Sequence, residues 1–350
     1  MTTTASCPLR AVPGYAGSHP GIQIGTYVPS DADDDDLKFL QQLGVEWAML
    51  IVKDPTHHTA EHYRAFGRRL AEYGIQIYRV ANHSVHNMEQ VTLNLPGRDE
   101  KIEEFCTFLR NLGAAGIRYN TYAHMGNGIW STGATEGRGG VHARVLDITH
   151  AKGHWNGQVF QGELTHGREY SEDELWDNYA YFIRKVMRVA EDEGVYVGFH
   201  PDDPPVYALG GIPRCIFGNF AGYQRALEIA DSPNFGVCLC VGCWLEGGKV
   251  GMGCDVIQAV QHFGAQGKLF KVHFRNVSNP MPAPWQETFI DDGYQDMHRV
   301  MQALRAANFD GCIIPDHIPQ MVGGSGPGLA YSIGYMRALV QAANNEAGGA

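Results

Sequence analysis

The sequence predicts a (β/α)8 barrel, in which eight parallel strands alternate with helices. Eight short β-type runs recur along the 350 residues, with helical segments between them. The runs are largely apolar, as expected for parallel strands that helices cover. The length suits a barrel of about 250 residues with loop insertions. A doubly wound sheet is the alternative, but no G-x-G-x-x-G follows the first strand and no G-x-x-x-x-G-K-[ST] occurs. We therefore expect one barrel domain over 1–350, with insertions after strands 4, 6 and 7.

The expected elements follow the β-then-α order throughout. The first helix begins near the acidic run 33–36, where negative charge favours a helix amino terminus, and we prefer this interpretation to a metal site. The other helical segments are 60–74, 98–112, 171–190, 221–231, 255–264, 295–307 and 333–343. The expected strands are 22–28, 45–52, 75–81, 117–123, 195–200, 235–241, 269–275 and 312–316.

The helix after strand four has the clearest pattern. Ser171 and Glu174 have the spacing of a capping box. The apolar residues that follow recur at helical spacing and define one buried face: Leu175, Tyr179, Phe182, Val186 and Ala190.

Composition excludes several classes of function. The 27 basic and 38 acidic residues give a net charge of −11, which disfavours binding to nucleic acid or to an anionic membrane. No apolar stretch is long enough for a transmembrane helix, and the amino terminus lacks the layout of a secretory signal. Eight cysteines are too few for a disulfide scaffold and indicate reduced thiols. We expect a soluble, cytoplasmic protein.

Four consecutive strands end in residues that bind metals. Strand five ends at His200, strand six near Cys240, strand seven near His273 and strand eight at Asp316. Because barrel enzymes build their sites at the carboxyl ends of the strands, these side chains are expected to converge. Two imidazoles, a thiolate and a carboxylate suit a divalent transition metal, and the thiolate argues against magnesium or calcium.

The cysteine cluster around strand six offers another metal hypothesis. Cys238, Cys240 and Cys243 form C-x-C-x-x-C, but a second matching pair is lacking. On a strand, Cys238 shares a face with Cys240 one layer deeper, which suits a buried filler. Cys243 lies past the strand end. We keep only Cys240 as a ligand.

The strand-end motifs resemble those of the mannonate dehydratase family. The matching segments are His200-Pro-Asp-Asp-Pro-Pro205, Cys240-Val-Gly242, His273-Phe-Arg275 and Pro315-Asp-His317, in this order. Four further pairs extend the match: Asp292-Gly293, Asp296-Met297, Gln320-Met321 and Tyr331-Ser332. The resemblance covers 175–340 and implies a TIM barrel of the xylose-isomerase-like kind. It implies dehydration of D-mannonate to 2-keto-3-deoxy-D-gluconate with Mn²⁺ or Fe²⁺.

The resemblance also implies roles for single residues. His200, Cys240, His273 and Asp316 correspond to the metal ligands, and His317 and Tyr331 to the family's acid and base. The first half departs from the family. The family's Trp-x-Arg-Thr segment, which helps to hold the sugar acid, is replaced by 128–133, which keeps Trp130 as a candidate substrate contact. The His-His-Ile-Pro-type motif after strand two is replaced by 53–58. We therefore expect the loops after strands two and four to set substrate choice.

Dehydration of a sugar acid requires proton removal at C2 and loss of the C3 hydroxyl. His317 is a candidate base because an imidazole titrates near pH 6.5, and Tyr331 is a candidate acid, although the sequence leaves their assignment open. Arg275 is expected either to clamp the substrate carboxylate or to pair with Asp202 or Asp203. Asp202 is a further candidate for substrate binding, and one of these aspartates is expected to orient His200.

Other functions stay open on the sequence. One alternative is a metal-dependent isomerase or epimerase of the xylose-isomerase-like type, which would return the proton to carbon. β-Elimination on a modified sugar would use the same site, and a non-catalytic sugar-binding barrel is a third possibility. We expect a small sugar acid or sugar as the partner and a homo-oligomeric protein.

Overall fold

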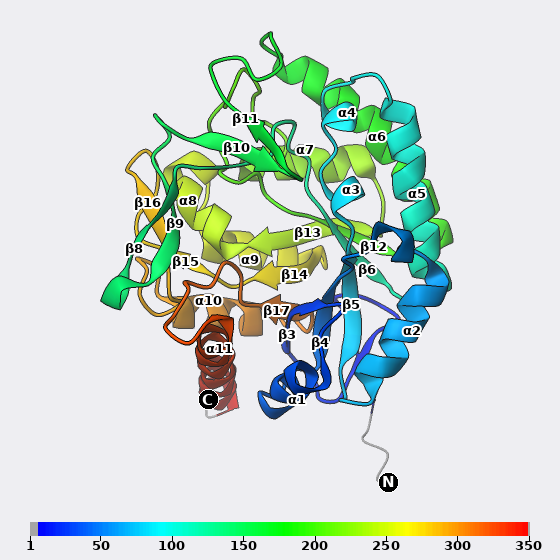
Figure 1. Ribbon diagram of the computed structural model, residues 1–350, viewed down its shortest axis with the longest axis vertical. Coiled ribbons are helices and arrows are strands. Elements are labelled where there is room, and N and C mark those ends of the chain that lie inside the picture. The colour runs from blue at the N-terminus through cyan, green and yellow to red at the C-terminus, as the bar shows by residue number, and fades with distance from the viewer. Residues whose placement is uncertain (1–5, 349–350) are drawn as a thin grey trace.

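The computed structural model describes residues 6–348 and contains the predicted barrel (Figure 1). Eight parallel strands form one sheet in the order β5-β4-β3-β17-β14-β13-β12-β6. Strands β5 and β6 end this order and lie beside each other, so the sheet is nearly closed. All eight predicted strands are confirmed: β3 (Gln23–Pro29), β4 (Trp47–Ile51), β5 (Gln76–Ala81), β6 (Tyr119–Tyr122), β12 (Tyr196–Phe199), β13 (Phe235–Cys240), β14 (Leu269–His273) and β17 (Cys312–Ile314).

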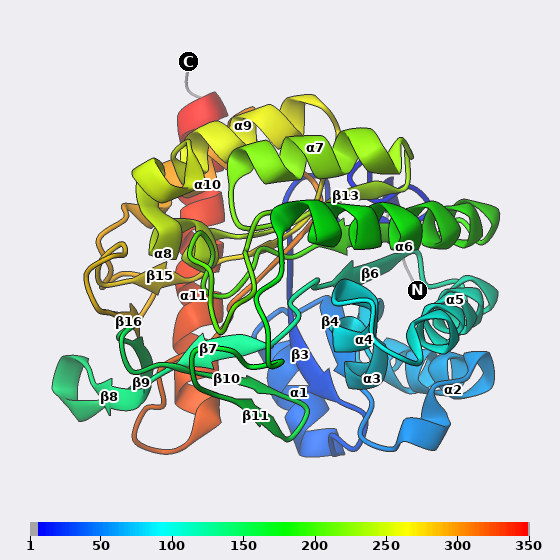
Figure 2. The same ribbon diagram turned by 90° about the horizontal axis from the view of Figure 1, so that it is seen from above.

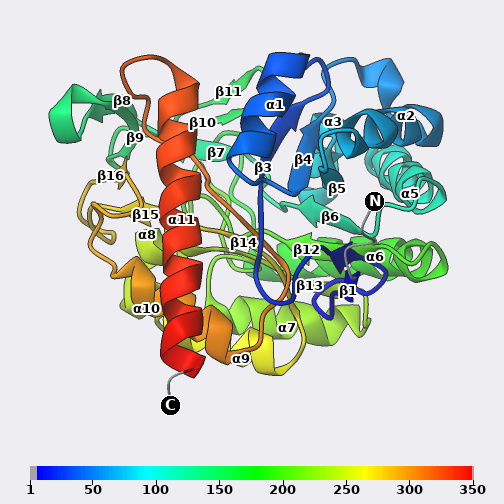
Figure 3. The same ribbon diagram turned by 90° about the horizontal axis from the view of Figure 1, so that it is seen from below.

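Helices surround the strands, as Figures 2 and 3 show from opposite sides. The helices that alternate with the barrel strands in this layer are α1 (Asp34–Gln42), α2 (Ala60–Ala71), α5 (Arg98–Ala114), α6 (Glu172–Asp192), α7 (Phe220–Ala230), α9 (Val256–Ala265), α10 (Met297–Ala306) and α11 (Ser325–Gly348). The prediction of a (β/α)8 barrel is therefore confirmed. No helix within residues 6–348 is long and apolar enough to cross a membrane. The predicted extent of the domain, 1–350, stays a prediction because its ends lie outside the described residues.

Side chains at the amino termini fix where two of these helices begin. The Ser171 hydroxyl accepts a hydrogen bond from the Glu174 amide, and the Glu174 carboxylate accepts one from the Ser171 amide. Asp33 and Asp36 make the same reciprocal pair before α1, with acidic residues throughout the first turn. Both predicted helix starts are confirmed, and each satisfies amide groups that would lack a partner.

The core has two layers. A large apolar cluster lies between the sheet and the helices, and the predicted face of α6 is buried in it. A smaller cluster fills the barrel interior and includes Tyr78, Tyr119 and Phe270. The hairpin of β1 (Cys7–Pro8) and β2 (Ala16–Gly17) adds residues of its connecting turn, such as Tyr15, to this inner cluster. The inner cluster fills the barrel interior below the carboxyl ends of the strands, where the predicted site residues lie.

Two strands contain a one-residue bulge that changes which side chains face the barrel interior. In β5 the pairing with β4 skips Tyr78, so that Ile77 pairs with Ala48 and Arg79 with Met49. In β14 the pairing with β13 skips Phe270 in the same way, and Lys271 pairs with Cys238. A bulge interrupts the alternation of side chains and redirects the residues that follow it.

The inserted segments carry the remaining elements. After β6 come β7 (Ile129–Ser131), β8 (Gly133–Glu136), η2 (Arg138–Gly140), β9 (His142–Leu146), β10 (Lys152–Trp155) and β11 (Gln158–Phe160). Other additions are η1 (Pro55–His57), α3 (His83–His86), α4 (Glu89–Thr92), α8 (Val241–Met252), β15 (Asn276–Val277) and β16 (Trp285–Thr288). Strands β11, β10 and β7 form one antiparallel sheet, and β15, β16, β9 and β8 form another. Both sheets lie on the side of the molecule away from the amino terminus (Figures 1 and 3).

Candidate active site

The carboxyl ends of four barrel strands bring the predicted metal ligands together. One donor atom each from Cys240, His273 and Asp316 lies within 4.8 Å of the other two. Cys240 belongs to a second such group with His200 and Cys243. The rings of His200 and His273 are 4.9 Å apart between centroids. Cys240 is thus the shared member around which the four predicted ligands gather.

The two histidines leave a ring nitrogen available to a metal. Nδ1 of His200 lies 2.7 Å from the carbonyl oxygen of Pro201, which can only accept, so Nε2 is the free acceptor. Nδ1 of His273 is buried 3.3 Å from Asp316 Oδ2, without a hydrogen-bond partner among the described residues. An unsatisfied buried nitrogen beside a thiol and a carboxylate fits a divalent metal.

The electrostatics of the cluster favour the ionised forms of its thiol and carboxyl groups. Burial acts to raise the pKa of Cys240, but hydrogen bonding by Cys243 and the charge of Arg275 bring that pKa well below its usual value. Cys240 also caps α8 and accepts the Cys243 amide at 3.4 Å, which adds the field of a helix amino terminus. Burial likewise acts to raise the pKa of Asp316, but His317 and His273 lower it well below normal. Both residues therefore have the charge that a metal ligand needs.

Arg275 lies at the centre of a buried ion network. Its guanidinium is 2.7 Å from Glu246, 3.3 Å from Asp203, 3.4 Å from Glu287 and 3.3 Å from Asp316. Of the two aspartates considered as its partner, Asp203 is the one in contact. A Cβ at Gly242 would lie 2.4 Å from the Arg275 side chain, so the close approach requires glycine.

A second arginine supports the same carboxylates from an inserted strand. Arg144 of β9 lies 2.9 Å from Asp203, 2.8 Å from Glu287 and 3.4 Å from Glu246. Burial and the charge of Asp203 raise the pKa of Glu246 to about 8, although both arginines oppose this shift. Sequence reasoning missed Arg144, Glu246 and Glu287, because the pairing of an inserted strand with the barrel mouth has no local signal.

Asp202 lies apart from this network. Its carboxylate is 3.7 Å from the guanidinium of Arg214, and burial raises its pKa to about 6. It does not line the cavity beside the predicted ligands, whereas Asp203 does. Asp202 therefore contacts Arg214 instead of lining the cavity, although the charge of His200 also acts on it.

His317 lies on the cavity wall and is held by two carboxylates. Its Nδ1 is 2.5 Å from Glu287 Oε1, and its Nε2 is 3.9 Å from Asp316 Oδ2. Burial acts to lower its pKa, but Asp316 and Glu287 raise the pKa to about 9. Its φ of 47° is left-handed, an uncommon conformation for a residue other than glycine. Such backbone strain is concentrated at functional sites.

Tyr331 and Trp130 lie away from this wall. The Tyr331 ring packs 5.6 Å from the Phe289 ring, and hydrogen bonding to Asp291 contributes to a raised pKa. Trp130 is buried and donates its indole N–H to the Asn127 carbonyl oxygen at 3.1 Å. The structure does not bring either side chain to the predicted ligands.

The cavity at the mouth has a volume of about 250 Å³. It is lined by the predicted ligands His200, His273 and Asp316 together with Asp203 and His317, and by a second group of residues, namely Tyr27, Arg79, His83, His86 and Trp155. Sequence reasoning missed the second group. Arg79 had a signal, because it is the only charged residue in the predicted strand 75–81. Trp155 comes from the hairpin of β10 and β11, where no local pattern pointed to the site.

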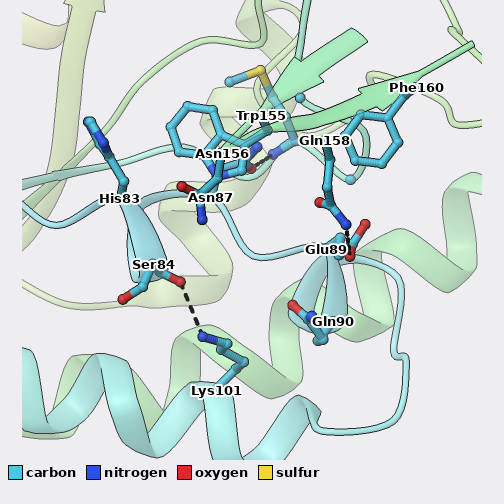
Figure 4. A pocket seen from close by; sticks show the side chains of 13 residues that line it. His83, Ser84, Asn87, Glu89, Gln90, Lys101, Trp155, Asn156, Gln158 and Phe160 are labelled. Carbon is cyan, nitrogen blue, oxygen red and sulfur yellow. Dashed lines mark hydrogen bonds between the residues drawn. The ribbon is translucent and has the colours of Figure 1, made fainter. Parts of the chain in front are cut away.

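A second cavity of about 360 Å³ adjoins the first. The two share His83, Met125 and Trp155 on their walls. Figure 4 shows that its remaining side chains are mostly polar, with Asn87, Gln90 and Gln158 among them. Nζ of Lys101 lies 3.4 Å from the Ser84 carbonyl oxygen at its edge.

Comparison with known proteins gives a consistent picture. The family model D-mannonate dehydratase (UxuA) matches residues 156–348. A mannonate dehydratase of Streptococcus pneumoniae is 32% identical over 292 residues, which are 77% of this chain and 76% of that protein.

Solved structures support the same fold. The mannonate dehydratase of Streptococcus suis serotype 2 superposes with a TM-score of 0.78 at 23% identity, covering 93% of this chain and 96% of that one. A xylose isomerase domain protein of Planctomyces limnophilus superposes with a TM-score of 0.61 at 14% identity, covering 93% and 99%. The fold is therefore that of the xylose-isomerase-like TIM barrels. On the family model and the curated relative, the chain belongs to the mannonate dehydratase family of hydro-lyases.

Proposed function

We propose that the protein is a metal-dependent dehydratase that converts D-mannonate to 2-keto-3-deoxy-D-gluconate. The observation that carries the proposal is the buried group of Cys240, His273 and Asp316 at the barrel mouth, with His317 on the same cavity wall. Membership of the family supplies the substrate, and the cavity supplies a site of the size class of a small molecule.

The metal would be held by His200, Cys240, His273 and Asp316. Two imidazole nitrogens, a thiolate and a carboxylate suit Mn²⁺ or Fe²⁺, the ions we propose. A bound divalent ion would supply Lewis acidity, which favours negative charge on nearby substrate oxygens. Arg275 contacts Asp316 and Asp203 and would position the first of these as a ligand.

Proton transfer to and from the substrate is assigned to His317. The reaction removes the proton at C2 of the sugar acid and expels the hydroxyl at C3. Glu287 contacts Nδ1 of His317 and so fixes the ring and leaves Nε2 to face the cavity. Tyr331 stays the predicted second group, although it lies beside Phe289 in this conformation.

Two broader properties complete the proposal. The protein would work in the cytoplasm, which the lack of a disulfide bond among residues 6–348 supports. It would act as a homo-oligomer, which light scattering checks directly, since a clean monomer removes this part.

The decisive experiment measures product formation from D-mannonate in D₂O. Protein loaded with Mn²⁺ or Fe²⁺ is expected to release 2-keto-3-deoxy-D-gluconate, and chelation of the metal is expected to abolish the activity. Exchange of deuterium at the α-carbon without loss of water would instead show an epimerase. A panel of other sugar acids, sugars and keto-sugars scores the alternative β-eliminations in the same assay.

A further inference from the structure

Arg79 is a buried cation on the cavity wall that has no partner within the protein. Its side chain belongs to a residue only 4% exposed, and it lines the 250 Å³ cavity beside the predicted ligands. Across residues 6–348 its guanidinium makes no ion pair and no hydrogen bond, and its Nε is buried without a partner. The other deeply buried arginines at this end of the barrel are all paired.

The bulge in β5 is what directs Arg79 into the cavity. Ile77 packs in the outer core and Tyr78 in the inner cluster, so regular alternation would turn Arg79 outward against the helices. The pairing with β4 skips Tyr78, and Arg79 therefore faces the same side as Tyr78. After the bulge, the side chains again alternate between the two faces of the strand: Val80 packs in the outer core and Ala81 lines the cavity.

The groups around Arg79 do not neutralise it. Its charge contributes to lowering the pKa of His83, His86 and Lys271, after burial as the main cause in each case. The charge of Arg79 also acts on Tyr27 and Tyr119, and burial raises the pKa of both tyrosines well above its usual value, so neither carries a negative charge. This wall therefore combines a cation with neutral or cationic groups.

Two other buried arginines have carboxylate partners, which Arg79 lacks among the described residues. Arg214 is as buried as Arg79, but it lies 3.7 Å from Asp202 and donates to the Gly128 carbonyl oxygen at 2.9 Å. Arg275 contacts four carboxylates. A buried charge is costly unless it is paired, so an unpaired guanidinium that faces a cavity indicates an anionic ligand.

We propose that Arg79 binds the carboxylate of the sugar-acid substrate. A guanidinium presents two parallel N–H donors that match the two oxygens of a carboxylate. The carboxylate is the only charged group of a sugar acid. The inference rests on the proposed function, because it names the residue of that site that selects acids over neutral sugars. Arg79 is thereby a binding residue that lines the same cavity as His317.

The test compares charged and neutral ligands on matched variants. Binding of D-mannonate, of D-gluconate and of the uncharged D-mannitol is measured by calorimetry on metal-free and Mn²⁺-loaded protein. Arg79→Met is expected to weaken binding of both acids by about 30-fold or more, and to leave D-mannitol unchanged. Arg79→Lys keeps the charge without the fork and is expected to fall between wild type and Arg79→Met. Arg214→Met, equally buried but facing away, is expected to retain the preference for acids.

A second readout separates a binding role from a structural one. Without ligand, Arg79→Met is expected to unfold at a higher temperature than wild type, because the substitution removes an unpaired buried charge. Arg214→Met is expected to unfold at a lower temperature, because it leaves Asp202 without its partner. A structural role for Arg79 would instead lower its unfolding temperature as well.

The outcomes decide the inference independently of the proposed function. Equal affinity of Arg79→Met and wild type for D-mannonate would overturn it, and so would a wild type that binds D-mannitol as tightly as D-mannonate. Turnover is scored separately. A wild type that binds sugar acids through Arg79 but dehydrates none of them would contradict the dehydratase and leave the carboxylate site standing.

Discussion

The histidines that line the cavity fall into two groups, and their pKa values are shifted in opposite directions. On the wall formed by β14 and β17, carboxylates outweigh burial and raise the pKa of His273 and His317. In the second group of lining residues, burial lowers the pKa of His83 and His86, and the charge of Arg79 adds to this effect on both. One wall therefore stabilises cations, whereas the other keeps its imidazoles neutral.

This difference separates the tasks of the two walls. The first wall holds more acidic groups than its two arginines neutralise, which suits a divalent metal. The second wall has a cation without a counter-charge, which suits the anionic end of a substrate. Binding and chemistry are thus assigned to different halves of the chain, and substitutions can test each half alone.

Removal of a predicted ligand should have the largest effect. Cys240→Ala deletes the donor shared by both ligand groups, and it is expected to lose bound metal and at least about 1000-fold in turnover. Metal content by mass spectrometry and product formation measure the two losses. Cys106→Ala, a buried cysteine of α5 in the outer layer, serves as the control and should retain both. A fully metallated Cys240→Ala protein would contradict the site.

Loss of the proton-transfer group comes next. His317→Asn keeps a polar side chain at this left-handed position and is expected to lower turnover about 100- to 10,000-fold, with metal still bound. Tyr331→Phe tests the second predicted group under the same conditions. An effect of Tyr331→Phe as large as that of His317→Asn would mean that Tyr331 reaches the substrate in the working enzyme.

The ion network of the first wall should dominate stability. Arg275→Met leaves Glu246 and Asp203 buried beside each other with one cation fewer, so we expect a loss of about 3–5 kcal/mol in the free energy of unfolding. Urea denaturation measures the loss. The exposed pair of Arg110 and Glu103 offers a control, because Arg110→Met should change stability by less than about 1 kcal/mol. Similar losses of unfolding free energy in the two variants would contradict the larger contribution of the buried network to stability.

Acid should act on His124, a buried histidine that packs against Phe182. Burial lowers the pKa of His124 from 6.5 to about 3. Below pH 6.5 the unfolded chain therefore binds a proton at His124, whereas the folded protein does not bind it until the pH approaches 3. Stability is therefore complete above pH 6.5 and falls as the pH drops towards 3. At pH 4 this costs wild type about 3 kcal/mol relative to His124→Leu. Urea midpoints of both proteins at pH 7 and pH 4 check the difference, and parallel losses would refute it.

The sequence was sufficient to predict the barrel and the convergence at its mouth. Periodicity and apolar runs located the strands, and the rule that barrel sites form at strand carboxyl ends led to Cys240, His273 and Asp316. The capping box at Ser171 was readable because its partner is three residues away. These features depend on local pattern or on a general property of the fold.

What could not be predicted depends on contacts between distant segments. Two consecutive aspartates, Asp202 and Asp203, look alike in the sequence, and only the tertiary structure shows that Asp203 meets Arg275. Trp155 reaches the cavity on an inserted hairpin, whereas Trp130 of the same insertion is buried. Arg79 was hidden by regular alternation, which places it on the outer face.

The two bulged strands have a consequence for reading this chain beside others. The extra residue of each strand is absorbed by the bulge, so deletion of Tyr78 would leave Arg79 paired with Met49 and facing the cavity. An alignment of β5 or β14 with an unbulged strand therefore needs a gap inside the strand, where alignments usually forbid one. Aligned without the gap, Arg79 and His273 would be compared with outward-facing residues of the other protein.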